Sequence, residues 1–320
     1  MQVQQKLAAP SQSSLRIRWK KTNLYKYWKY RHLTILLIPC IAYFAIFHYV
    51  PVYGLQIAFK DYNFFDGIWG SAWVGLEHFR HLFELASFWQ VFRNTVVISL
   101  YKFIFGFPAP IIFALLLNEL RLLFFKRIVQ TISYFPHFVS WVILGGIFVQ
   151  FLSPSIGPIN IVLKSLGMEP IYFLADPKWF RSVLVVTDVW KGLGWGTIIY
   201  LAALSGINPE LYEVATVDGA NRFQRVLHIT LPSMIPVITI MMILTIGQLI
   251  NDDFDQVFNL YNPAVYSVGD VLSTYTYRHG LVDLQYSFAT AVGLFKNVIS
   301  LVLVLSANWI AKRFNEYALW

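Results

Sequence analysis

The chain has 320 residues, of which 57% are apolar and only 13% charged, and its mean hydropathy is +0.55. Soluble proteins have roughly 45–50% apolar and about 25% charged residues, so this composition excludes a water-soluble protein and indicates a chain embedded in a lipid bilayer. The net charge of +8 arises in residues 1–32, which hold eight Lys and Arg and no acid, whereas the rest of the chain is neutral overall. The basic charge therefore belongs to one end of a membrane protein, and nucleic-acid binding is not expected.

The N-terminal part continues from this basic segment into an apolar run between Leu33 and about Val50. A secretory signal is the alternative to a membrane helix, but the run is longer than the apolar region of a signal peptide, and no small-x-small cleavage site follows it. We therefore expect an uncleaved first transmembrane helix. The expected organisation is a basic cytoplasmic segment at 1–32 and one transmembrane domain over 33–320. The single cysteine, Cys40, excludes an intrachain disulfide.

Six apolar runs are long enough to cross a hydrocarbon core, for which a helix needs about 20 residues. They are 33–53, 91–117, 128–151, 181–204, 233–250 and 288–310. The sequence thus predicts an all-α polytopic membrane protein with six transmembrane helices. Lys and Arg are enriched in cytoplasmic loops, and fifteen of them lie on the side of the N-terminus against seven on the other side. Both termini and the segment 205–232 are therefore expected in the cytoplasm.

The segment 205–232 carries local signals for a short helix followed by a sharp turn. Asn208 is a good N-cap, and Pro209 suits the first helical position. Asp218-Gly219 predicts the end of this helix, because glycine adopts a positive φ without strain.

A second short helix is expected from Ala220 to about Ile229, ending before Pro232. The two helices would lie at the cytoplasmic surface between the fourth and fifth spans. On helical signals alone, the favoured interpretation is an amphipathic surface loop that merely connects two spans.

The residues of this segment resemble the Glu-Ala-Ala loop in permeases of binding-protein-dependent ABC importers. The family pattern is Glu-Ala-Ala, three residues, glycine, nine residues and Ile-x-Leu-Pro. It stands here as Glu213-Val214-Ala215, Gly219 and Ile229-Thr230-Leu231-Pro232. The one departure, valine in place of the first alanine, keeps a small apolar residue. The resemblance extends over residues 33–320 and includes the stretches 134–141, 260–266 and 293–296, which are similar to polysaccharide-importing permeases related to the larger maltose-transporter subunit.

The resemblance implies a type I ABC importer permease of the bacterial inner membrane, which carries an oligosaccharide and is not an enzyme. Its partners would be a second permease subunit, two ATPase subunits and an extracytoplasmic binding protein. Alginate and pectin fragments are cargo of this group. No catalytic residue, metal or cofactor is expected on this chain, and ATP and Mg would bind to the ATPase subunits. The residues expected to couple the chain to an ATPase subunit are Glu213, Ala215, Asp218, Gly219 and Ala220.

Two other functions were compared with this interpretation: an ion-coupled secondary transporter or channel, and a membrane enzyme that acts on lipid-linked sugars. A secondary transporter needs no docking loop, and an enzyme needs an acid or metal constellation that is not apparent. The sequence has no Gly-x4-Gly-Lys-Ser/Thr phosphate loop, so ATP hydrolysis is expected on another chain. Asp252, Asp253 and Asp255 lack the spacing of a calcium-binding loop and are expected in a solvated outer loop.

Four charged residues lie deep within the predicted spans, away from their ends, namely Lys102, Asp188, Lys191 and Lys296. Charges at such depth are costly and usually face a polar interior or a transport pathway. Asp188 is expected to pair with Lys191, three residues further along the helix, or with a neighbouring lysine. One acid cannot neutralise three lysines, so the layer would keep a formal charge of about +2 that attracts a carboxylated sugar chain.

Three glycines alternate in the fourth predicted span, at positions 192, 194 and 196. Their spacing is not that of a dinucleotide-binding loop, and small residues allow membrane helices to approach closely. We therefore expect a helix-packing role for them.

The outer segments 54–90 and 251–287 are rich in aromatic residues. Anchoring at the membrane interface is the expected role of these rings, and the alternative is that they stack on sugars or contact the binding protein. The residues concerned are Trp69, Trp73, Tyr261, Tyr266, Tyr275 and Tyr277.

Overall fold

The computed structural model describes residues 30–314, and these fall into two compact units that divide after Gln56. The described part of the first unit is helical from Arg31 onward. Its elements are α2 (Arg31–Phe44), the π-helical turn η1 (Ala45–Tyr49), α3 (Val50–Val52) and the beginning of the 3-10 helix η2 (Tyr53–Phe59). This run covers the first predicted span. Residues 1–29 of the predicted basic segment lie outside the described residues.

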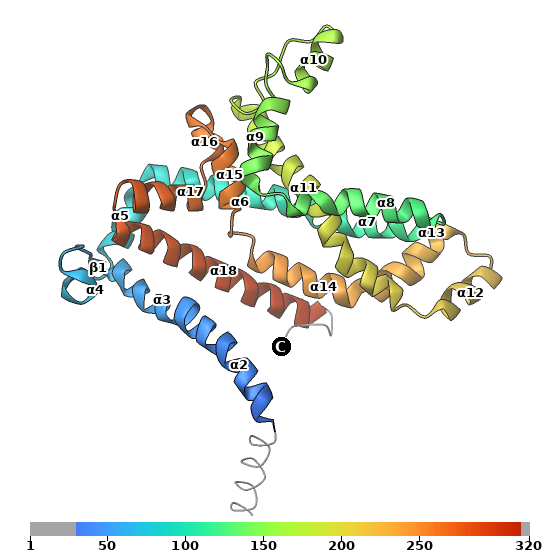
Figure 1. Ribbon diagram of the computed structural model, residues 1–320, viewed down its shortest axis with the longest axis horizontal. Helices are drawn as coiled ribbons and strands as arrows, with labels where there is room; N and C mark the ends of the chain where they lie inside the picture. Colours follow the sequence, from blue (N-terminus) through green and yellow to red (C-terminus); the bar gives the residue numbers. More distant parts are fainter. Residues whose placement is uncertain (1–29, 315–320) are drawn as a thin grey trace, which may run out of the picture. The chain divides into compact units, whose positions relative to one another are not determined.

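The second unit begins with a small antiparallel hairpin, in which β1 (Lys60–Asp61) pairs with β2 (Ala72–Trp73) around the short helix α4 (Gly67–Gly70). The rest of this unit is helical (Figure 1). Its longer helices are α5 (Glu77–Glu84), α6 (Ala86–Gly106), α7 (Pro108–Glu119), α8 (Leu123–Tyr134), α9 (Trp141–Phe151), α10 (Pro158–Ser165), α11 (Pro177–Ser205), α12 (Pro209–Val217), α14 (Leu231–Gly247) and α18 (Tyr286–Phe314). Its shorter ones are η3 (Phe135–Phe138), α13 (Arg222–Arg225), η4 (Val226–Thr230), α15 (Phe254–Leu260), η5 (Pro263–Val265), α16 (Tyr266–Gly269), α17 (Leu272–Tyr277) and η6 (Arg278–Val282).

Four helical runs within residues 30–314 are long and apolar enough to cross a membrane. They are Arg31–Phe59, Ala86–Glu119, Arg222–Gly247 and Tyr286–Arg313, and they correspond to the first, second, fifth and sixth predicted spans. The fourth predicted span is α11, which has 29 residues and therefore the necessary length. Its sequence is more polar than that of the other four, because it holds two of the four ionisable residues at membrane depth.

The third predicted span is not one straight helix. The run Leu123–Phe138 and the helix Trp141–Phe151 meet at an angle of 104°, so they form a broken span or a re-entrant segment. Pro136 lies at the start of η3, and Ser140 caps α9 by accepting the N–H of Ile143 at 3.4 Å. The break follows from these two local signals, since proline disfavours a continuous helix and serine begins a new one.

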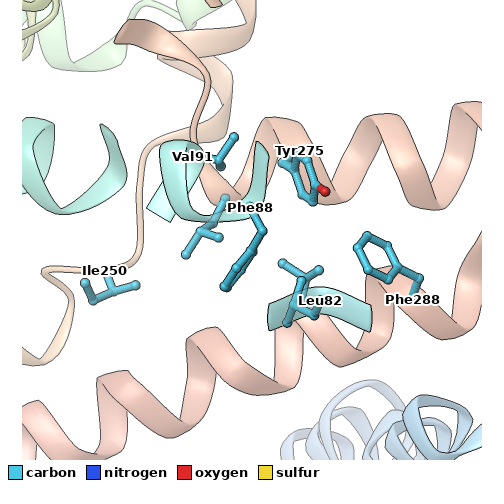
Figure 2. Packing of buried hydrophobic residues seen from close by; sticks show 8 residues of the cluster. Leu82, Phe88, Val91, Ile250, Tyr275 and Phe288 are labelled. Atoms are coloured by element: carbon cyan, nitrogen blue, oxygen red, sulfur yellow. The ribbon is translucent and has the colours of Figure 1, made fainter. Parts of the chain in front are cut away.

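The core of the second unit joins helices that are distant in sequence. One cluster contains Phe88 from α6, Tyr275 from α17 and Phe288 from α18, together with Leu82 and Ile250 (Figure 2). A second cluster joins α7, α11 and α14 through Ile111, Ala114, Tyr200, Leu204 and Met234. The second cluster holds α11 beside α7, and Ile98 of α6 packs with Phe180 and Leu184 of α11, so that polar residues of α6 and α11 come to lie at one level.

The glycines of α11 differ in what surrounds them. A Cβ at Gly194 would lie 2.1 Å from the backbone oxygen of Ser133, and one at Gly196 would lie 3.0 Å from the Pro110 ring. Close packing is therefore confirmed at these two positions. At Gly192 a Cβ would meet nothing within 4 Å, so this glycine borders open space and does not pack a helix.

Replacing Gly194 by alanine should destabilise the protein, because the added methyl group would force α11 away from the Ser133 backbone. Overpacking of this kind costs about 1–3 kcal/mol. Gly146→Ala is the matched control, since a Cβ there meets nothing within 4 Å. The unfolding midpoint of the purified protein should fall for Gly194→Ala and stay unchanged for Gly146→Ala. Equal midpoints would contradict the packing role.

Candidate functional site

The segment 205–232, called the coupling loop after its predicted role, is built from local capping interactions. Asn208 caps α12 by accepting the N–H of Glu210 at 3.0 Å, as predicted. The next helix, α13, starts with a capping box: the side chain of Asn221 accepts the N–H of Gln224 at 2.9 Å, and the side chain of Gln224 accepts the N–H of Asn221 at 2.8 Å. Such reciprocal bonds satisfy donors that a helix start leaves free, so both helices are defined by their own residues.

The turn between α12 and α13 has the geometry of a Schellman motif. The N–H of Gly219 donates to the oxygen of Thr216 at 3.1 Å, and the N–H of Ala220 donates to the oxygen of Ala215 at 2.8 Å. Gly219 has φ +79°, a conformation that strains any residue with a Cβ. The predicted end of the first helix at Asp218-Gly219 is therefore confirmed.

The predicted end of the second helix before Pro232 is wrong. The chain passes from α13 through the π-helical turn η4 directly into α14, so that Arg222–Gly247 is one helical run. A proline ring clashes with the carbonyl one turn before it in a regular α-helix, and here that turn is the wider π-helix. The coupling loop is consequently continuous with the fifth span.

Among the polar contacts of the coupling loop, one connects it with α7 and another joins its two ends. Arg222 lies 3.7 Å from Glu119 at the end of α7, and the hydroxyl groups of Tyr212 and Thr230 lie 2.9 Å apart. The first pair is half exposed and contributes little by itself. The second joins α12 to the start of α14 at a buried threonine.

The solvent-exposed surface of the coupling loop carries apolar side chains. Val214 is 61% exposed, Phe223 74% and Val217 88%. Glu213 is also exposed, and its carboxylate forms no hydrogen bond or ion pair with any other residue in the range 30–314. Figure 1 shows α12 and α13 together at one end of the second unit, away from α10. A patch of this kind is typical of a surface that a partner covers.

A central cavity of about 320 Å³ lies between α6, α11 and the end of α14. Gly192 borders this cavity, and six polar or charged side chains form part of its wall. Those residues are Lys102, Asp188, Gln248, Asn251, Asp252 and Asp253. Lys102 and Asp188, two of the four predicted pathway residues, therefore line the same cavity.

Lys102 is held by two partners from different helices. Its Nζ lies 3.2 Å from Oδ1 of Asp188 and donates a hydrogen bond to Oε1 of Gln256. Gln256 is fully buried and donates in turn to the oxygen of Leu184 at 2.7 Å and to the hydroxyl of Thr187 at 2.8 Å. The expected pairing of Asp188 with a neighbouring lysine is thus formed with Lys102 across two helices, and not with Lys191.

Lys296 is bound by a residue that the sequence placed in a solvated loop. Its Nζ lies 2.6 Å from Oδ1 of Asp252 and donates to the hydroxyl of Ser273 at 2.8 Å. The Asp252 side chain is only 2% exposed, and its Oδ2 accepts the N–H of Ser273 at 2.9 Å. The expectation of a solvated Asp252 is therefore wrong, because the chain turns back into the protein after α14.

Lys191 lies over the ring of Trp141, with its Nζ 4.6 Å from the ring centroid. The indole N–H of Trp141 donates to Oδ2 of Asp253 at 2.5 Å. Asp252 and Asp253 thus belong to the same layer as the three lysines. The predicted surplus of +2 is wrong, because Asp252 and Asp253 bring the layer to three aspartates and three lysines, of which Lys102–Asp188 and Lys296–Asp252 form ion pairs.

The outer aromatic residues have different environments. Tyr275 is only 2% exposed and packs in the cluster of Figure 2, so it does not face a ligand or the membrane surface. Trp69 and Trp73 are 80% and 65% exposed. Burial raises the pKa of Tyr261 to about 12, with the neighbouring Tyr266 adding to the shift.

A further ion pair of the outer segment was not foreseen from the sequence. Arg278 donates to Oδ2 of Asp270 at 2.5 Å, and its guanidinium lies 5.0 Å from the ring centroid of Tyr266. Burial alone would lower the pKa of Arg278, but the hydrogen bond and the charge of Asp270 raise it. Gln256 and Asp270 were not singled out from the sequence, and the pairing of Asp252 was not predicted, because these interactions depend on residues that lie on other helices or in other segments and leave no local pattern.

Comparison with known proteins agrees with this geometry. Residues 106–316 match the family described as "Binding-protein-dependent transport system inner membrane component". Protein LplB of Bacillus subtilis (strain 168) is 46% identical over 288 residues, which cover 90% of this chain and 91% of that protein. The polygalacturonan/rhamnogalacturonan transport system permease protein YteP of the same organism is 42% identical over 94% of each chain.

Among solved structures, a bacterial alginate ABC transporter in complex with alginate pentasaccharide-bound periplasmic protein contains a similar chain. The TM-score is 0.85 at 41% identity, and the match covers 92% of this chain and 99% of that chain. The matched family covers more than half of this chain, and the structural similarity extends over nearly all of it. The chain therefore belongs to the family of binding-protein-dependent transport system inner membrane components, and it is a multi-pass inner-membrane permease with the type I fold of ABC importers.

Proposed function

We propose that this chain is one of two permease subunits in an importer that carries an acidic oligosaccharide. Two ATPase subunits would bind ATP and Mg on the cytoplasmic side, where both termini lie, and a loaded binding protein would dock on the outer side. The periplasmic protein in the solved relative supports the last of these partners. The observation that carries the proposal is the continuous helix Arg222–Gly247, which runs from the coupling loop to the central cavity.

The exposed patch of Val214, Val217 and Phe223 is the surface that we assign to the ATPase subunit, with Glu213 contributing a charge at its edge. At 1.5 Å per residue, the helix that starts in this loop spans about 39 Å. Its end is followed at once by Gln248 and Asn251, which line the cavity. Movement of the ATPase subunits would therefore reach the cavity along a single rigid element.

Acidic cargo is supported by two observations. YteP and the solved transporter are described with polygalacturonan and alginate, both of which carry carboxylates. In this chain, the ammonium of Lys102 borders the cavity, donates one hydrogen bond to Gln256 and forms an ion pair with Asp188, while an ammonium has three donors in all. The layer of three lysines and three aspartates is neutral overall. Recognition of the acidic sugar would therefore depend on individual hydrogen-bond donors such as Lys102 more than on general electrostatic attraction.

Co-purification and uptake test the proposal. The chain should purify with a second permease subunit and with an ATPase subunit, and the reconstituted complex should take up galacturonate oligosaccharides only with ATP and the binding protein. Uptake that follows an ion gradient without ATP would instead identify a secondary transporter.

Lys102→Met should weaken uptake of an acidic oligosaccharide more than uptake of a neutral one of equal length. One hydrogen bond to a charged group contributes about 1.5–3 kcal/mol, so the acidic substrate should lose about tenfold or more in kcat/KM. Parallel uptake of both sugars in proteoliposomes provides the measurement, and Lys126→Met in the α8 segment is the control. If both sugars lose uptake equally, the lysine supports the helices and does not contact the cargo.

A further inference from the structure

A second cavity, of about 540 Å³, lies between α15, α17 and the first half of α18. It is larger than the central cavity and lies within the 300–1,000 Å³ that ligand sites usually occupy. Asn251 lines both cavities, whereas Asp252 lines only the first and Lys296 only the second. The Asp252–Lys296 ion pair is therefore the partition between the two spaces.

One wall of this second cavity is a single face of α18. Tyr286, Thr290, Gly293 and Asn297 follow each other at intervals of three or four residues, which places them along one side of a helix. A Cβ at Gly293 would meet nothing within 4 Å, so the missing side chain leaves open space.

The opposite wall supplies aromatic rings. Phe254 and Tyr277 lie 5.3 Å apart between ring centroids, and both line the cavity. The apolar C–H face of a pyranose ring packs well on such rings, while its hydroxyl groups need hydrogen-bond partners.

Those partners are present around the rings. The hydroxyls of Thr276 and Thr290 each donate to a carbonyl of their own helix at 2.7 Å, which leaves their oxygen lone pairs free to accept from a ligand. Lys296 uses two of its three N–H donors on Asp252 and Ser273. The exposed amide of Asn297 forms no hydrogen bond within the described part of the chain.

We propose that this second cavity is a further sugar subsite, which binds one pyranose unit of an oligosaccharide whose neighbouring units occupy the central cavity. Lys296 would donate its third N–H to an oxygen of that unit, hydroxyl or carboxylate. This inference rests on the proposed transport of an oligosaccharide. It makes the two cavities consecutive parts of one binding path and predicts a preference for chains longer than a disaccharide.

The test fills each cavity separately. Gly293→Leu places a side chain in the second cavity, Gly192→Leu places one in the central cavity, and Gly146→Leu is the control on α9. None of the three glycines has an atom within 4 Å of an added Cβ, so the first atom of the new side chain is accommodated equally at each. Uptake of galacturonate disaccharide and pentasaccharide is measured for each variant in proteoliposomes with the ATPase subunits and binding protein.

Gly293→Leu should raise the KM for the pentasaccharide about tenfold, which corresponds to ~1.4 kcal/mol, and leave the disaccharide nearly unchanged. Gly192→Leu should reduce uptake of both, and Gly146→Leu should reduce neither. If Gly192→Leu alone impairs uptake, the subsite is refuted while the proposed function stands. If the complex with no substitution takes up neither sugar, the proposed function itself fails.

A loss of assembly gives a separate answer. If Gly293→Leu prevents co-purification of the second permease subunit and Gly146→Leu does not, the cavity is a subunit contact and the sugar subsite is refuted. If Gly293→Leu does not fold, Gly293→Ala and Asn297→Leu replace it, because both alter the same wall. If both variants take up the pentasaccharide normally, the proposal is refuted.

Discussion

Gly219→Val should strongly reduce ATP hydrolysis stimulated by the binding protein and leave the protein in the membrane. The residue has φ +79° in the Schellman turn that separates α12 from α13. A residue with a Cβ pays about 1–2 kcal/mol in this conformation, and a β-branched one more, so the turn would open and displace α12. We expect stimulated hydrolysis to fall about tenfold or more, measured with the reconstituted complex.

Two further variants separate coupling from general backbone strain. Gly167 has φ +78° with nothing within 4 Å of an added Cβ, but it follows α10 in the expected outer part of the chain. Gly167→Val introduces the same strain there and should leave hydrolysis largely intact. Gly219→Asn should retain most of the activity, because asparagine tolerates a positive φ. Normal stimulated hydrolysis in Gly219→Val would refute the coupling role of this turn.

Asp252→Asn should lower stability more than any surface substitution, because it leaves the ammonium of Lys296 buried without a counter-charge. The two side chains are 2% and 13% exposed and 2.6 Å apart. Removing one partner of a buried ion pair costs about 3–5 kcal/mol, whereas replacing both can be nearly neutral. The double variant Asp252→Asn with Lys296→Met should therefore recover most of the lost stability.

The unfolding midpoint of the purified protein measures this effect. Glu119→Gln is the control, because its pair with Arg222 is about half exposed at 3.7 Å and should contribute at most about 1 kcal/mol. A midpoint for Asp252→Asn equal to that of Glu119→Gln would show that the Lys296 pair is not a stabilising partition between the cavities.

The Gly219 turn could be predicted from the sequence, whereas the Asp252–Lys296 ion pair could not. In the coupling loop, Asn208, Asp218 and Gly219 act on residues two to five positions away, and their roles were readable from spacing alone. The membrane class was equally evident from composition, because a chain with so few charges cannot cover a surface facing water. Even the break in the third span has a local signal, since Pro136 and Ser140 lie within it.

The charged layer was decided by the tertiary structure. Lys102 and Gln256 are 154 positions apart, and Lys296 and Asp252 are 44 positions apart. Hydropathy places a lysine at a depth in the membrane, but it does not say which helix faces meet there. The three aspartates and three lysines compensate each other only because α14 ends at Gly247 and the following residues turn inward. A buried charge needs a partner to offset its desolvation, and packing of the helices determines which residue that is.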